Sequence, residues 1–265
     1  TGNVAVTTAL MGVSTAAAKD NAVKWGRGLD PVTNQARQQL ADVLHNEPRL
    51  VAYKTDEDLV RVENIKNGTV SASASPEELY MFFGTNEGFI HAVDPETGEE
   101  KFAFIPKELL PNLNAYYTDP KGSDAKRYGM DGQINLWVEY GALDTTTKSR
   151  SITKNYLYAG MRRGGRNYYA LDVGTITSPA LKWVIKGGTT PGFEKLGQTW
   201  STPKLADINV NGTKTKVLIF TGGYDPQQDN DSPNTPLAND NYGNSLYIVN
   251  AETGQLIWRA GHTSE

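Results

Sequence analysis

The sequence contains no cysteine, only three histidines and no long run of apolar residues. The absence of cysteine excludes disulfide bonds, thiolate zinc sites and thiol catalysis, although it does not fix the compartment, because a large core can dispense with disulfides. His45, His91 and His262 lie far apart, so a histidine-rich metal site is not expected. No stretch of about 18 apolar residues occurs, and no membrane-spanning helix is predicted.

The charge balance and the composition limit the class of protein further. A formal net charge of −4 at pH 7 provides no concentrated basic face of the kind that binds nucleic acid. With 38% hydrophobic and 21% charged residues, a chain of 265 residues can bury a sizeable core. Residues 1–20 lack the basic start and apolar centre of a signal peptide, and the chain does not begin with Met. We therefore expect a piece of a longer protein.

The first 45 residues differ from the remainder and are predicted to form a partly irregular lead-in segment. Residues 1–24 are rich in Ala, Thr, Val and Gly without a clear period. Residues 31–45 place four apolar residues at helical spacing between Pro31 and Pro48, which predicts a short helix there.

Three parts of the chain repeat one strand-and-turn plan, marked by Asp94, Asp172 and Asn250, which follow one another at intervals of 78 residues. The stretches HAVDPETGEEKF and YIVNAETGQLIW match closely, each with a strand that ends in Asp or Asn, a turn and another strand. The Asp or Asn side chain can accept a hydrogen bond from a backbone N–H two residues on. Gly98 and Gly254 can adopt the positive φ that such a turn requires.

Four strands are expected between consecutive marks, which is the content of one β-propeller blade. Blades usually take about 40–50 residues, and the excess here falls in two insertions, at 107–134 and 224–243. We therefore predict an all-β fold in which residues 46–265 form about three blades of an incomplete propeller. Three blades are too few to close a ring, since propellers have about four to eight.

Four segments carry a family resemblance. In order, they resemble the C-terminal propeller, with quinoprotein-like blades, of the PilY/PilC family of type IV pilus tip and biogenesis proteins, over about residues 22–265. The segments are DVLHNEPRLVAY, MFFGTNEGFIHAVDPETGEEKFAFIP, YAGMRRGGRNYYALDV and GGYDPQQDNDSPNTPLANDNYGNSLYIVNAETGQLIWRAG.

The resemblance implies a non-enzymatic protein at the pilus tip or outer-membrane surface of a Gram-negative bacterium. Such a protein would serve pilus assembly, adhesion and twitching, would bind minor pilins and host or abiotic surfaces, and would be regulated by calcium. The family's DxNxDxxxD-type calcium loop does not occur in this chain, so the main calcium site is expected outside it. The stretch GRGLD has a Leu inserted into an Arg-Gly-Asp motif, so integrin binding is not transferred.

Two stretches have the oxygen-rich composition of a calcium site. The insertion GGYDPQQDNDSPNTPLANDNYG holds Asp225, Asp229, Asp231 and Asp240, which are hard oxygen ligands, although a solvated loop gives the same composition. The stretch DINVNG has Asp207, Asn209 and Asn211 at the spacing of an EF-hand start. Only one of these is a carboxylate, and an Asn-Gly β-turn between two strands is the favoured interpretation. Of the two, the insertion is the better candidate.

The stretch MRRGGR places Arg162, Arg163 and Arg166 around two glycines in a predicted hairpin turn. Functionally it could bind a carboxylate, a phosphate or a partner surface. A tight turn with its arginines in solvent or paired within the blade is the favoured interpretation. The contact surface itself is predicted in the insertions at 107–134 and 224–243, and the five tryptophans are expected in the core or at blade edges.

No catalytic set is evident, since no GxSxG stretch accompanies the serine, histidine and acidic residues. Two alternatives remain open. A PQQ-dependent quinoprotein dehydrogenase would need a cofactor, a metal, a catalytic Asp and usually a Trp docking repeat, and Trp137, Trp183 and Trp258 form no such repeat. A scaffold propeller for outer-membrane protein assembly is the other alternative.

Overall fold

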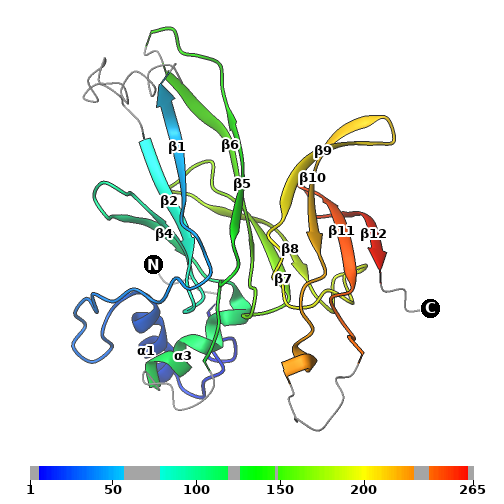
Figure 1. Cartoon of the computed structure of the whole chain (residues 1–265). Helices are drawn as coiled ribbons and strands as arrows, with labels where there is room; N and C mark the ends of the chain where they lie inside the picture. The colour runs from blue at the N-terminus through cyan, green and yellow to red at the C-terminus, as the bar shows by residue number, and fades with distance from the viewer. Residues whose placement is uncertain (1–5, 57–77, 119–125, 147–148, 230–238, 262–265) are drawn as a thin grey trace.

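Twelve strands form three antiparallel meanders of four strands each in the computed structural model of the chain, which describes residues 6–56, 78–118, 126–146, 149–229 and 239–261 (Figure 1). Blade 1 consists of β1 (Arg49–Asp56), β2 (Glu78–Gly84), β3 (Ile90–Val93) and β4 (Glu100–Phe104). Blade 2 consists of β5 (Ile134–Tyr140), β6 (Ser149–Gly160), β7 (Asn167–Asp172) and β8 (Ala180–Lys186). Blade 3 consists of β9 (Lys204–Val210), β10 (Thr213–Thr221), β11 (Ser245–Asn250) and β12 (Leu256–Gly261). The prediction of an all-β fold with about three four-stranded blades is confirmed.

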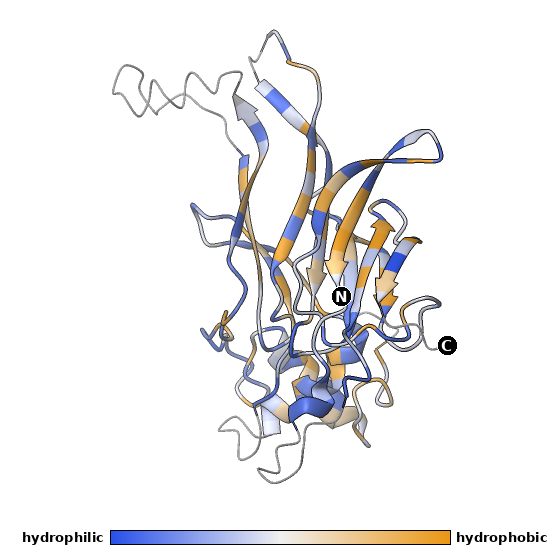
Figure 2. Cartoon of the chain, turned by 45° about the vertical axis from the view of Figure 1, so that its right-hand side comes forward, coloured by the Kyte–Doolittle hydropathy of each residue, from blue (hydrophilic) through white to orange (hydrophobic). Residues whose placement is uncertain are grey.

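One pairing was not predicted. The end of β1 pairs with the start of β6, from Lys54 opposite Ser151 to Asp56 opposite Ser149. Blades 1 and 2 thereby share one eight-stranded sheet, while blade 3 is a separate four-stranded sheet. Figure 2 shows hydrophobic and hydrophilic residues alternating along the strands, as expected where neighbouring side chains point to opposite faces of a sheet.

The helix expected over residues 31–45 is not formed, and that prediction was wrong. The Oδ1 atom of Asp30 accepts hydrogen bonds from two following backbone N–H groups, at 2.9 and 2.7 Å, and starts a turn instead. Asn34 and Gln38 then have φ values of 58° and 49°, which interrupt any right-handed helix. A helix lies earlier, at α1 (Ala16–Gly26), where the sequence showed no clear period.

The helices gather at one end of the blades (Figure 1). Helix α1 begins at the N-cap Thr15, whose side chain accepts from Ala18 N at 3.1 Å. It packs against α3 (Leu110–Thr118), where Trp25 stacks on Tyr116 with ring centroids 5.9 Å apart. Two short 3-10 helices are η2 (Lys107–Leu109) and η3 (Pro226–Asp229). Within the described ranges, no helix has the length and apolar character needed to cross a membrane.

The repeated turns have the predicted geometry. The Oδ1 atom of Asp94 accepts from Glu96 N at 2.9 Å, and the Oδ1 atom of Asn250 accepts from Glu252 N at 2.8 Å. Gly98 and Gly254 have φ values of 74° and 73°. The expected side-chain-to-backbone hydrogen bonds and positive φ values are therefore confirmed.

The turns at Asn250 and Asp172 also tie one blade to its neighbour through the carbonyl that follows the marked residue. Tyr158 OH and Trp183 Nε1 of blade 2 donate to Ala251 O of blade 3, at 3.0 and 3.1 Å. Tyr53 OH of blade 1 donates to Val173 O of blade 2 in the same way. These hydrogen bonds lie beside two apolar cores, one between blades 1 and 2 and one between blades 2 and 3.

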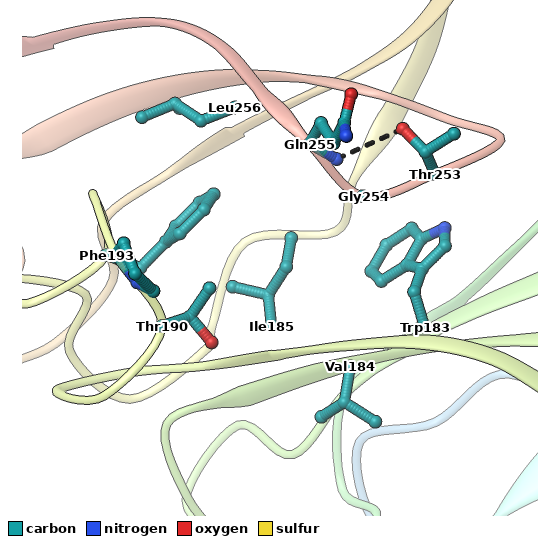
Figure 3. A pocket seen from close by; sticks show the side chains of 10 residues that line it. Trp183, Val184, Ile185, Thr190, Phe193, Thr253, Gly254, Gln255 and Leu256 are labelled. Carbon is teal, nitrogen blue, oxygen red and sulfur yellow. Dashed lines mark hydrogen bonds between the residues drawn. The ribbon is translucent and has the colours of Figure 1, made fainter.

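The seam between blades 2 and 3 also shows why Gly254 is needed. Figure 3 shows the turn of Thr253, Gly254 and Gln255 above Trp183, beside a pocket of about 470 Å³. A Cβ atom on Gly254 would lie 2.8 Å from Cδ2 of that indole ring. The glycine thus serves both the positive φ and the close approach of the turn to the tryptophan.

The blades touch through backbone at one end. The loop from β2 to β3 and the loop from β6 to β7 each hydrogen-bond the segment that precedes the next blade: Met130 N donates to Thr85 O at 3.0 Å, and Thr199 N donates to Gly165 O at 3.2 Å. Within blade 2, at the same end, a Cβ on Gly132 would lie 2.5 Å from the carbonyl oxygen of Gly160, so no side chain fits there.

Replacing Gly132 by Ala should therefore lower the free energy of unfolding by about 1–3 kcal/mol, because the added methyl group must displace backbone. Gly141→Ala is the matched control, since its new methyl group would lie 3.1 Å from the Thr153 side chain and 3.6 Å, an ordinary van der Waals distance, from the backbone oxygen of Ser151. Urea denaturation followed by tryptophan fluorescence measures both. Equal stabilities of the two variants would contradict the close-contact explanation.

The carboxylate of Glu252 forms a second link between blades 2 and 3. It accepts from Tyr156 OH at 2.8 Å and Lys182 Nζ at 3.0 Å, and Lys154 Nζ lies 3.5 Å away. Burial by itself would raise the pKa of Glu252, but the hydrogen bonds from Lys182 and Tyr156 and the lysine charges outweigh it and lower this pKa.

A carboxyl group whose pKa is lowered by folding stabilises the protein above its unfolded pKa, and this stabilisation is lost as the pH falls through the folded pKa. Glu252→Gln should therefore be less stable than the wild type at pH 7, by less than about 1 kcal/mol because the side chain is 41% exposed. The difference should shrink between about pH 5 and pH 3. Urea denaturation of the wild type and the variant at pH 7 and pH 3 measures the difference in stability. A difference that is larger at pH 3 than at pH 7 would contradict the lowered pKa of Glu252.

Candidate binding site

Loops of all three blades meet at one end, which we call the loop end. It consists of the β2–β3, β6–β7 and β10–β11 loops and of the segments that precede β1, β5 and β9. In an antiparallel meander the second turn and the start of the first strand lie at the same end, so each blade contributes both. Figure 1 shows α3 and η3 at this end and the β9–β10 turn at the opposite end.

A buried carboxylate lies at the centre of the loop end. The side chain of Asp131 is 1% exposed and is 2.9 Å from His45 Nδ1 and 3.2 Å from Arg162 Nη1. Arg162 has a φ of 49°, a conformation that a non-glycine residue adopts at some cost in energy. Its guanidinium carbon lies 4.1 Å from the ring centroid of Trp200. Asp131 thereby fixes the position of an arginine that faces the surface.

Arg163 joins the two insertions. Its Nη1 lies 3.3 Å from Asp229 Oδ2, and its guanidinium carbon lies 5.8 Å from the ring of Tyr128 and 5.3 Å from the ring of Trp200. Tyr224 OH donates to Asp229 Oδ1 at 2.7 Å. Tyr128 belongs to the 107–134 insertion, whereas Asp229 belongs to the 224–243 insertion, so the fold brings both insertions and the arginine loop to one place.

Arg162 and Arg163, with Asp131 and Trp200, form what we call the arginine cluster. Arg166 does not belong to it. Its Nε donates to Leu196 O at 2.7 Å, its Nη2 donates to Glu194 O at 3.1 Å, and its guanidinium lies 3.9 Å from the ring of Tyr242. These contacts hold neighbouring loops together. For Arg166 they agree with the favoured interpretation, in which the arginines of this turn are paired within the protein. A partner-binding role of Arg162 and Arg163 remains a prediction.

A groove of about 680 Å³ runs beside Arg162, between the segment that precedes β1 and Trp200. Leu44 is 50% exposed and Trp200 is 37% exposed at its walls. The Oδ1 atom of the buried Asn46 has no hydrogen-bond partner among the residues that the structure describes. Trp200 was expected in the core or at a blade edge, and that prediction was wrong, because this tryptophan lies in a loop rather than on a strand.

His45, Asp131 and Trp200 were not predicted as site residues. One signal was available: HNEPRLVAY, DGQINLWVEY and TWSTPKLADI all precede or begin the first strand of a blade. His45, Asp131 and Trp200 lie three or four residues before the first strand of their blades, which could have indicated that they lie at the same end.

The carboxylates proposed for calcium in the 224–243 insertion have other partners. Asp225 is 3% exposed and accepts from the backbone N–H groups of Gln227, Asn241 and Tyr242, at 2.9, 2.6 and 3.3 Å. Asp229 pairs with Arg163, Asp240 accepts from Gln228 Nε2 at 2.9 Å, and Asp231 lies outside the described residues. In the described part of the chain, no three acidic or histidine side chains are grouped as a metal site. Calcium binding here stays a prediction.

The second calcium candidate lies in a two-residue hairpin. Val210 pairs with Thr213, and Asn211 and Gly212 between them have φ values of 50° and 84°, so the favoured Asn-Gly turn is confirmed. Asp207 lies on β9 and is 2.9 Å from Lys216 Nζ. Asn209 is opposite Lys214 across the two strands. The Asp207, Asn209 and Asn211 set therefore lies beside two lysines at the end opposite the arginine cluster.

Asp131→Ala should lower the free energy of unfolding by about 2 kcal/mol, because it leaves the partly buried Arg162 and His45 without their anionic partner. The cost stays below that of a fully buried pair, since Arg162 is 20% and His45 36% exposed. Glu47→Gln, at a side chain that is 73% exposed, is the control and should change stability by less than about 0.5 kcal/mol. Chemical denaturation compares them, and two equal losses would contradict a central role for Asp131.

Curated proteins are similar in sequence to most of this chain, although no family model matches it. It is 28% identical over 183 residues to a type IV pilus biogenesis factor PilY1 homolog of Xylella fastidiosa, covering 68% of this chain and 14% of that protein. A second such homolog of that bacterium is 30% identical over 182 residues, covering 67% and 10%. Type IV pilus biogenesis factor PilY1 of Pseudomonas aeruginosa is 27% identical over 237 residues, covering 87% and 18%.

The similarity of the chain to solved structures is weaker. The C-terminal domain of Pseudomonas aeruginosa PilY1 aligns with a TM-score of 0.42 at 22% identity, covering 77% of this chain and 33% of that one. A quinohemoprotein alcohol dehydrogenase of Comamonas testosteroni aligns with a TM-score of 0.35 at 16% identity, covering 70% and 27%. Both scores lie below 0.5, and the family assignment rests on the sequence relatives. The chain spans less than a fifth of the length of these relatives, and it belongs to the PilY1 family of type IV pilus biogenesis factors.

Proposed function

We propose that this chain is a binding module of a type IV pilus biogenesis protein and that its loop end contacts minor pilins. The observation that carries the proposal is the convergence of Arg162, Arg163 and Trp200 with both insertions at one end of three packed blades. The module acts without catalysis, and the blades serve as a frame that holds the loops in place.

The composition of the loop end suits protein recognition. Arginine, tryptophan and tyrosine are the residue types that contribute most to binding energy at protein interfaces. Here Trp200 is 37% exposed and is flanked by two guanidinium groups and by the ring of Tyr224, whose centroid is 5.2 Å away. Because Asp131 and Asp229 already fix the two arginines, little side-chain freedom is lost when a partner binds.

Pilus subunits are the proposed partners because the sequence relatives are named as type IV pilus biogenesis factors. The proposed contact with pilins lies outside the cell, at the pilus tip or the outer-membrane surface. Adhesion to a host or abiotic surface would use the same end, since Trp200 and Arg163 are partly exposed there.

Trp200→Ala should weaken binding of the full chain to purified minor pilins of the source organism by about 30-fold, in line with the loss of a central aromatic contact. Arg163→Gln should weaken it by about tenfold. Lys214→Ala is the matched control, because Lys214 is 79% exposed at the opposite end. Biolayer interferometry measures the three dissociation constants. Equal affinities would reject the loop end as the contact surface, and no binding by the wild type would reject the proposed function.

Calcium regulation through the 224–243 insertion is a separate hypothesis. Binding there would require Asp229 to leave Arg163 and Asp240 to leave Gln228, so calcium would rearrange the loop end itself. Isothermal titration calorimetry with calcium chloride, on the wild type and on a variant with Asp225, Asp229 and Asp231 changed to Ala, tests it. Loss of one site's heat in the variant supports the hypothesis, and identical traces reject it for this chain.

A further inference from the structure

One ring nitrogen of His45 contacts two groups that require opposite partners. Its Nδ1 lies 3.0 Å from Oδ1 and 2.9 Å from Oδ2 of Asp131, which are acceptors, and 3.0 Å from Nη1 of Arg162, which is a donor. A ring nitrogen carries either a proton or a lone pair, so it cannot donate to the carboxylate and accept from the guanidinium at the same time. These two hydrogen bonds of His45 are therefore alternatives.

Arg162 depends on the same carboxylate. Its Nη1 lies 3.2 Å from Oδ2 of Asp131, the oxygen that His45 also contacts. The Asp131 side chain is 1% exposed, so its oxygens rely on protein donors. When both nitrogens of the His45 ring are protonated, two positive charges lie 3.0 Å apart beside one negative charge. The carboxylate balances only one of them.

Other charges near His45 do not relieve this competition. In the lining of the groove, the other charged side chains are Arg162 and Glu47, and Glu47 is 73% exposed, so water screens its charge. Charged side chains of the same segment and of the neighbouring loops are paired with one another, in the pairs Glu47–Arg49 at 3.7 Å, Asp42–Lys126 at 2.6 Å and Arg163–Asp229 at 3.3 Å. Asp131 is thus the buried counterion for which His45 and Arg162 compete.

We propose that protonation of His45 switches Arg162 between two positions. With neutral His45, Arg162 donates to Nδ1 and to Asp131, and its guanidinium carbon is held 4.1 Å from the ring centroid of Trp200. With protonated His45, the imidazolium replaces the guanidinium at the carboxylate, and Arg162 turns into the groove that both side chains line. Histidine is the side chain that ordinarily changes charge between about pH 5 and 8, and His45 is 36% exposed to water.

The switch would regulate the contact with minor pilins, and in that respect it rests on the proposed function of the loop end. Arg162 is fixed before binding only when His45 is neutral, and in acid its side chain has to be ordered again when the partner binds. The affinity for minor pilins should therefore be about three- to tenfold lower at pH 5.5 than at pH 7.5. In the variant His45→Gln this loss of affinity should be absent.

Fluorine NMR of the full chain labelled with fluorotryptophan tests the switch without a partner. The Trp200 resonance, assigned by its loss in Trp200→Phe, should follow one titration curve between about pH 8 and pH 5, because a cation leaves the ring. His45→Gln should keep this resonance constant. His91→Gln is the matched control and should keep the wild-type curve, since His91 lies on β3 and pairs with Glu100 at 2.6 Å.

Arg162→Met separates the switch from a direct effect of the histidine charge on the ring. The Trp200 curve should disappear in this variant, although His45 is still present. A constant Trp200 resonance in the wild type would overturn the proposal. So would an unchanged curve in Arg162→Met or in His45→Gln, each with a circular dichroism spectrum like that of the wild type.

Biolayer interferometry with purified minor pilins at pH 7.5 and pH 5.5 distinguishes the two proposals. A titrating Trp200 resonance together with equal affinities at both pH values would reject the regulation of pilin binding. No pilin binding at either pH value would reject the proposed function, whereas a titrating resonance would still support the switch.

Discussion

Direct backbone contact between consecutive blades is the constraint on which the remainder of the structure depends. The turn after the second strand of one blade hydrogen-bonds the segment that leads into the next blade, as Thr85 does with Met130 and Gly165 with Thr199. Such contacts require glycine where a carbonyl group takes the space of a side chain, as at Gly84 of blade 1, where the carbonyl oxygen of Met130 occupies the position of a Cβ atom. These contacts hold the β2–β3 and β6–β7 loops against the segments that lead into β5 and β9.

The same constraint positions Asp131, Arg162 and Trp200 next to one another. Asp131 lies beside Gly132 in the segment fixed by Met130, so its carboxylate cannot move without disturbing two blades. Arg162 is held in a left-handed conformation, and its guanidinium lies over Trp200 of the following segment. Charged and aromatic side chains from three blades therefore meet in a fixed arrangement, which suits recognition of a protein surface.

Local chemistry made much of the fold predictable. The spacing of Asp94, Asp172 and Asn250 predicted the blade repeat, since an Asx turn and a glycine with positive φ are properties of a few adjacent residues. The helix over residues 31–45 was wrong because a single Asp30 turn outweighed weak helical periodicity. The pairing of β1 with β6 was missed, since it joins residues about a hundred positions apart that carry no complementary pattern.

The sequence by itself determined the strands, the turns and the family, because these depend on residue types at short spacing. It also indicated that the MRRGGR loop and the two insertions were the places to examine. Only the tertiary structure decided that Arg163, Tyr128 and Asp229 are neighbours, that Arg166 is committed to Leu196 and Glu194, and that Asp131 is buried. Contacts between blades depend on how whole sheets pack against one another, and no spacing within one strand or turn encodes that packing.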